Sequence, residues 1–134
     1  MKHTKSAGGV VARNNLILVV NQKRTSWSLP KGHIDRESKI QAAKREIYEE
    51  SGVTSLKLIK ELGSYQRYKI GDDGREDKTE LKTIYMFLFH TNQEALKPVD
   101  PENPEAKWVS KENVADLLTH PKDKEFFLSI IDEI

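Results

Sequence analysis

The sequence has no cysteine among its 134 residues, and this absence excludes disulfides, thiolate zinc sites and a cysteine nucleophile. It also lacks a long apolar run, since the longest, Leu16 to Val20, is far shorter than the roughly 20 residues of a membrane helix. Neither sign of charge dominates, because 22 Lys and Arg stand against 21 Asp and Glu, for a net charge of +1. We therefore expect a cytoplasmic protein without membrane contact, and no stable nucleic-acid binding through bulk charge.

The chain length fits a single domain over residues 1–134. Apolar runs predict strands, two of them joined by a turn at Asn14 and Asn15 and two forming a hairpin around residues 71–74. The expected strands are 10–12, 16–20, 56–59, 63–70, 81–90 and 107–109, and the expected helices are 38–51, 110–119 and 122–134. Residues 27–33 are expected to form a loop because they contain Pro30 and Gly32. This order predicts an α/β fold with a mixed β-sheet sandwiched between helices.

The segment 38–51 is the best helix candidate, since it has helical apolar spacing and neither proline nor glycine. Its end carries three carboxylates on one side: Glu46 and Glu50 lie one turn apart, and Glu49 lies beside them. Like charges at this spacing repel, and the negative end of the helix dipole makes their placement worse. A divalent cation would relieve both effects, and Mg²⁺ binds carboxylates together with phosphate oxygens. The alternative is a solvated acidic helix face.

The context of this helix resembles the signature of the Nudix hydrolase family, G-x5-E-x7-R-E-U-x-E-E-x-G-U, where U is aliphatic. Glu37 is followed after seven residues by Arg45, and residues 45–53 read REIYEESGV, so every position from Glu37 onward matches. The loop from Gly32 to Glu37 is one residue shorter than the pattern, and Arg36 stands where related sequences often have Pro-Gly. The resemblance implies a Nudix-like α/β/α sandwich and metal-dependent hydrolysis of a nucleoside diphosphate linked to another group.

The resemblance also implies residue roles. Glu46, Glu49 and Glu50, with the backbone carbonyl of Gly32, would hold Mg²⁺ or Mn²⁺, and Glu49 would also take part in catalysis. Arg45 would orient these carboxylates through Glu37. Such ions neutralise a polyanionic substrate and lower the pKa of bound water, so the implied chemistry agrees with the crowded acids.

A carboxylate outside the helix often completes such sites as a ligand or general base. Glu102 is our candidate, because it lies in a proline-rich loop six residues before Trp108, and this resembles the arrangement in several branches of the family. Glu105 and Glu80 are the rivals. For binding the small-molecule nucleotide substrate, the candidates are Lys31 and Lys82 toward phosphate and Tyr85 toward a nucleobase.

The string LPKGH at 29–33 resembles the branch that cleaves diadenosine polyphosphates, although Ala106 replaces a tyrosine common there. Diadenosine tetraphosphate is therefore the first substrate hypothesis. The alternatives are sanitising of oxidised nucleoside triphosphates, RNA 5′-end pyrophosphohydrolysis and diphosphoinositol phosphate hydrolysis. A catalytically inactive nucleotide-binding module and an interaction domain that uses its C-terminal helix are alternatives of another class. Either a monomer or a homodimer is compatible with the sequence.

Overall fold

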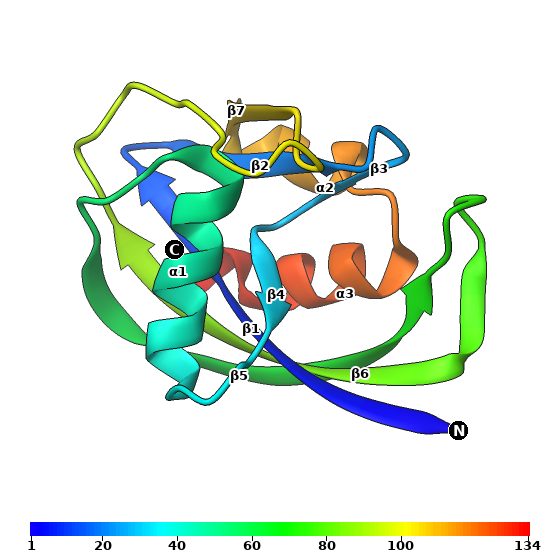
Figure 1. The fold of residues 1–134 in the computed structure, drawn as a ribbon. Coiled ribbons are helices and arrows are strands. Elements are labelled where there is room, and N and C mark those ends of the chain that lie inside the picture. Colours follow the sequence, from blue (N-terminus) through cyan, green and yellow to red (C-terminus); the bar gives the residue numbers. More distant parts are fainter.

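The computed structural model describes residues 1–134 as a seven-stranded mixed sheet with helices on both faces (Figure 1). Its centre is β1 (Lys2–Arg13), which runs parallel to β6 (Glu76–His90) along eleven residue pairs from Lys2 with Glu80 to Ala12 with His90. The strand order is β3-β2-β1-β6-β5, with β4 paired to β1 and β7 paired to β2. The remaining strands are β2 (Leu16–Gln22), β3 (Ser26–Ser28), β4 (Lys31–His33), β5 (Lys57–Ile70) and β7 (Glu105–Ser110).

The central strands are apolar on both faces because each face is covered by a helix. Along β6, Ile84 and Met86 join the core beneath α3 (Pro121–Ile130), whereas Phe87 and Phe89 join the core beneath α1 (Lys39–Ser51). This alternation gives two separate hydrophobic clusters, one on each side of the sheet. The predicted mixed sheet between helices is confirmed. The interaction-domain hypothesis needed four C-terminal side chains on the surface, but Phe126, Phe127 and Ile130 are buried and Ile131 is partly buried against the same core.

Helix α1 begins and ends as its sequence predicts. Ser38 accepts a hydrogen bond from the Gln41 amide, and the Gln41 side chain accepts one from the Ser38 amide, which completes a capping box. At the other end Gly52 has φ +80°, and its amide donates to the Tyr48 carbonyl at 2.7 Å. A side chain there would also meet the Lys97 carbonyl at 2.5 Å, so the cap and the following chain both require glycine. These caps fix where the acidic end of the helix lies.

Several elements differ from the sequence-based predictions. Residues 27–33 do not form a loop. They lie in two short strands on either side of Pro30: β3, which pairs with β2, and β4, which pairs with β1. The predicted strands 56–59 and 63–70 belong to one strand, β5. Its pairing with β6 shifts register between Leu58 and Lys60 and again between Glu61 and Gly63. The helix predicted for 110–119 is a 3-10 turn, η1 (Lys111–Asn113), followed by the short α2 (Val114–Leu117). The last predicted helix is α3 followed by a second 3-10 turn, η2 (Ile131–Glu133). No helix is long and apolar enough to cross a membrane.

Candidate active site

Arg45 organises the acidic end of α1. Its Nε and Nη2 form a fork on the Glu37 carboxylate at 2.6 to 3.2 Å, and Nη2 also donates to the His33 carbonyl at 2.9 Å. On its other side Nη1 donates to Glu46 at 2.7 Å and to Glu49 at 3.2 Å. The Glu37 carboxylate, by hydrogen bonding, raises the pKa of Arg45, so this guanidinium is a permanent cation. A single arginine therefore sets the positions of three carboxylates.

The short loop before α1 closes through a left-handed residue. Arg36 has φ +54°, a conformation that costs a non-glycine residue about 1 kcal/mol or more. The loop also places the Asp35 amide 3.2 Å from the Glu37 carboxylate, and this bond adds to the Arg45 bonds that lower the pKa of Glu37. Although the loop is one residue shorter than the family pattern, Glu37 still reaches Arg45.

Glu50 is the buried acid of helix α1, with 3% of its surface exposed. Burial, followed by the hydrogen bond and the charge of the neighbouring Glu46 carboxyl, raises the pKa of Glu50 well above its ordinary value. The backbone amide of Lys31 donates to Glu50 at 3.3 Å and opposes this effect only in part. Two adjacent carboxyls with too little positive charge around them are what a divalent cation would neutralise.

The residues at this point fit a divalent ion. Gly32 lies against the Glu46 carboxylate so closely that a Cβ there would stand 2.3 Å from Oε2, and the Gly32 backbone therefore lies beside a metal-ligand candidate. The carboxylates of Glu46, Glu49 and Glu50 do not converge as a ready-made group of three, and Arg45 binds two of them. The candidate ligand atoms are all oxygens, which suits Mg²⁺ or Mn²⁺ rather than a softer metal.

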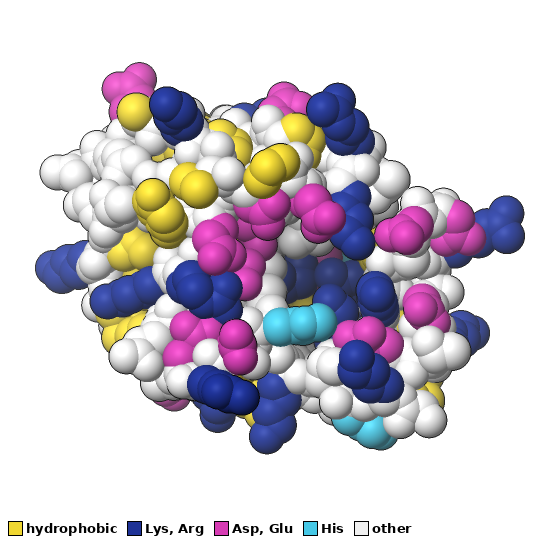
Figure 2. Space-filling model, in the orientation of Figure 1, with side chains coloured by type: hydrophobic (Ala, Val, Ile, Leu, Met, Phe, Trp, Pro, Cys, Tyr) yellow, Lys and Arg dark blue, Asp and Glu magenta, His cyan; other side chains and the backbone are white.

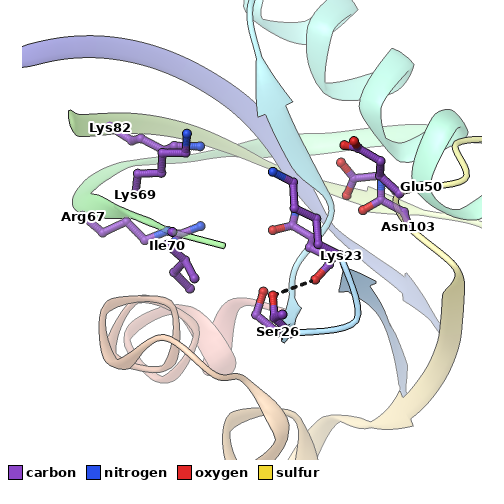
Figure 3. Close-up of a pocket in the computed structure, with 12 residues that line it drawn as sticks. Lys23, Ser26, Glu50, Arg67, Lys69, Ile70, Lys82 and Asn103 are labelled. Atoms are coloured by element: carbon purple, nitrogen blue, oxygen red, sulfur yellow. Dashed lines mark hydrogen bonds between the residues drawn. The ribbon is translucent and has the colours of Figure 1, made fainter. Parts of the chain in front are cut away.

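A cavity of about 180 Å³ opens beside Glu50 and has an acidic and a basic side. Figure 2 shows acidic and basic side chains facing each other across a hollow in this face of the molecule. Figure 3 shows Glu50 and Asn103 on one side and Arg67, Lys69 and Lys82 on the other. The lining contains a single hydrophobic residue, Ile70, and no aromatic residue. The full lining is Gln22, Lys23, Thr25, Ser26, Glu50, Arg67, Lys69, Ile70, Gly71, Lys82, Glu102 and Asn103.

Glu102 lies at this cavity, and its loop is fixed by backbone hydrogen bonds at both ends. The amides of Val99 and Asp100 donate to the Glu49 carbonyl at 2.9 and 3.0 Å, and the Lys23 amide donates to the Glu102 carbonyl at 2.7 Å. The rivals lie elsewhere. Glu105 is an exposed residue at the start of β7, and Glu80 accepts a hydrogen bond from Thr4 at 2.9 Å outside the cavity.

The basic side was only partly foreseen from the sequence. The sequence predicts a role for Lys82 on β6, but Arg67 and Lys69 on β5 belong to no motif and are not predicted. Arg67 pairs directly with Lys82 across the two strands, so both side chains point to the same sheet face. Burial, followed by the charge of Arg67, lowers the pKa of Lys82. The detectable signal was two cations at alternate positions, 67 and 69, in a strand that precedes a hairpin turn.

The other two substrate-binding candidates lie outside the cavity lining. The Lys31 side chain is buried, with its ammonium 3.6 Å from Asp123 of α3 and hydrogen-bonded to the Ser28 hydroxyl. Burial lowers the pKa of Lys31 to about 8, although the Asp123 charge opposes this. Tyr85 stands an odd number of residues from Lys82 and therefore faces the opposite side of the sheet. There its ring lies 3.9 Å from the Lys39 ammonium.

Comparison with known proteins agrees with this geometry. The model of the NUDIX domain matches residues 2–130. The chain belongs to the Nudix family. An RNA pyrophosphohydrolase of Pelagibacter ubique is 30% identical over 121 residues, covering 81% of this chain and 77% of the relative. Another RNA pyrophosphohydrolase, from Bartonella henselae, is 30% identical over 120 residues, covering 80% and 69%. The Nudix chain described here is thus a hydrolase that acts on pyrophosphate bonds.

A solved structure supports the fold of this Nudix hydrolase. The Ap4A hydrolase of C. elegans, in a binary complex, superposes with a TM-score of 0.78 over 97% of this chain and 96% of that one. The two sequences are 22% identical, so this likeness concerns the fold.

Proposed function

We propose that this Nudix hydrolase removes pyrophosphate from the 5′-triphosphate end of RNA and leaves a 5′-monophosphate. The proposal is supported above all by the cavity, which has carboxylates on one side, cations on the other and no aromatic residue in its lining. Such a cavity suits a phosphate chain, whereas a nucleoside bound inside would need an apolar or aromatic surface for its base. The relatives named as RNA pyrophosphohydrolases point to the same substrate.

In the proposed reaction a water oxygen forms a bond to the α-phosphorus, and the bond from that phosphorus to the α–β bridging oxygen breaks. Pyrophosphate leaves with the bridging oxygen, and the attacking water gives up a proton. Glu102 is the proposed base for that proton, since it lies at the cavity on a loop fixed at both ends. Glu46, Glu49, Glu50 and the Gly32 carbonyl are proposed to hold Mg²⁺ or Mn²⁺.

Bound divalent ions supply positive charge that withdraws electrons from the phosphoryl group. Arg45 and Glu37 keep the ligand carboxylates in place, because the guanidinium binds Glu37 on one side and Glu46 and Glu49 on the other. Lys82 is the proposed contact to the phosphate chain from the basic side. The roles of Lys31 and Tyr85 in substrate binding find no support in the cavity lining, since neither residue belongs to it.

Diadenosine tetraphosphate is the second candidate substrate, supported by the LPKGH string and by the fold shared with the Ap4A hydrolase. The test offers the protein three substrates with Mg²⁺: a 5′-triphosphate RNA oligonucleotide, diadenosine tetraphosphate and an oxidised nucleoside triphosphate. Products are identified by mass. We expect 5′-monophosphate RNA and pyrophosphate to form fastest. Faster release of ATP and AMP from diadenosine tetraphosphate would favour the second candidate, and no turnover of any substrate would overturn the proposal.

A further inference from the structure

Arg67 is a buried cation that the Nudix signature leaves unexplained. It lies on β5 at the cavity, and 5% of its surface is exposed. The structure gives its guanidinium one long hydrogen bond, from Nη1 to the Tyr68 carbonyl at 3.5 Å, and leaves Nε without one. Figure 3 shows its side chain on the cavity wall opposite Glu50. An arginine buried with so few partners has donors to offer to a ligand.

Asp123 forms an ion pair with this guanidinium but does not cancel its charge. Its Oδ1 lies 3.3 Å from Arg67 Nε and accepts a hydrogen bond from the Tyr65 hydroxyl at 2.5 Å. Its Oδ2 lies 3.6 Å from the ammonium of Lys31, so one carboxylate is shared by two cations. Lys82, directly across from Arg67, and Lys69 add further positive charge at the cavity. The basic side therefore carries excess positive charge, as the helix end carries excess negative charge.

We propose that Arg67 binds a phosphate group of the substrate chain beyond the phosphorus that is attacked, with Asp123 as its positioning residue. If the attacked phosphate lies at the carboxylates, the rest of the chain must extend toward the opposite, basic side. A guanidinium fork can bind two oxygens of one phosphate, which a single ammonium cannot do. Arg67 thereby favours substrates with three or more consecutive phosphates over those with two, and this inference rests on the proposed function.

The test compares Arg67→Lys with Arg75→Lys, which makes the same replacement at an exposed position outside the cavity lining of the same hairpin. Calorimetry with inorganic triphosphate, in EDTA, measures binding without turnover. We expect Arg67→Lys to weaken triphosphate binding about tenfold, because the bidentate charged contact is lost while the charge beside Asp123 remains. Arg75→Lys should bind triphosphate as the wild type does.

A second measurement uses the unmodified protein and decides the matter if Arg67→Lys does not fold. With Mg²⁺ present to hold one phosphate at the carboxylates, the wild type should bind the non-hydrolysable imidotriphosphate about tenfold more tightly than imidodiphosphate, since only the longer chain gains the extra charged contact. Equal binding of the two anions, no binding of triphosphate, or an Arg67→Lys variant that binds like the wild type would each overturn the inference. Failure of RNA hydrolysis with triphosphate binding intact would overturn the proposed function and leave the phosphate contact standing.

Discussion

The two sides of the cavity bear opposite charges and were encoded in opposite ways. The acidic side is built around one helix, where Glu50 reaches the cavity and Glu46 and Glu49 lie within about one turn of it, and Glu102 joins it from a loop. The basic side combines Arg67 and Lys82, which are far apart in the chain and meet through the register of β5 and β6. Each side of the cavity places like charges together, which lowers stability. Bound cations would offset the repulsion on the acidic side, and a phosphate chain would offset it on the basic side. In both cases we propose a ligand site from the crowded charge, but only the local cluster is readable as a motif.

The largest expected effect of a substitution is on the acidic side. Glu50→Gln should lower kcat about a thousandfold, equivalent to about 4 kcal/mol of barrier, because it removes a proposed ligand charge. The melting temperature should not fall, since an amide in place of the buried carboxylate ends its repulsion with Glu46. Steady-state kinetics and thermal unfolding check both. Glu125→Gln, on the exposed face of α3, is the control, and activity of Glu50→Gln within twofold of wild type would exclude Glu50 from the mechanism.

On the basic side the largest effect should fall on stability. Asp123→Ala leaves the buried cations Lys31 and Arg67 without their carboxylate, so the free energy of unfolding should drop by about 3–5 kcal/mol. Urea unfolding measures this. The matched control is Glu133→Ala, which breaks the exposed ion pair with Lys60 and should cost less than about 1 kcal/mol. Equal losses in the two variants would show that the buried cations do not depend on Asp123.

The next effect separates the loop carboxylates. Glu102→Gln should lower kcat about a hundredfold with little change in KM, because a proposed proton acceptor is removed while the cavity keeps its shape. Glu105→Gln, three residues further along and outside the cavity lining, should leave both constants unchanged. A larger loss for Glu105→Gln than for Glu102→Gln would reverse the assignment of the base.

The smallest expected effect concerns acid stability. Burial tends to raise the pKa of Asp123, but Lys31 and Arg67 outweigh it and hold that pKa below its ordinary 3.8. A carboxyl with a lowered folded pKa stabilises the protein above the unfolded pKa, and this stabilisation is lost as pH falls through the folded value. Wild type should therefore lose more unfolding free energy than Asp123→Asn below about pH 4. Parallel pH profiles for the two proteins would show that Asp123 is not held ionised by its neighbours.

Local sequence patterns predicted α1 with its Ser38 and Gly52 caps and the hairpin after β5, because caps and turns depend on residues close in the chain. The start of β1 at Lys2 was not predicted, since its polar residues form a strand only by pairing with distant β6. The same holds for the basic side: nothing near Arg67 in the chain indicates that Lys82 will lie opposite. The position of Tyr85 could have been foreseen, because strand alternation separates it from Lys82.

We infer that the crowded carboxylates of α1 hold divalent ions. Calorimetric titration of the wild type with Mn²⁺, compared with Glu50→Gln, tests this without any substrate or turnover. We expect saturable binding by the wild type and binding weakened at least about tenfold in the variant, because one charged ligand is lost. Identical Mn²⁺ binding by the two proteins, or no binding by the wild type, would contradict it.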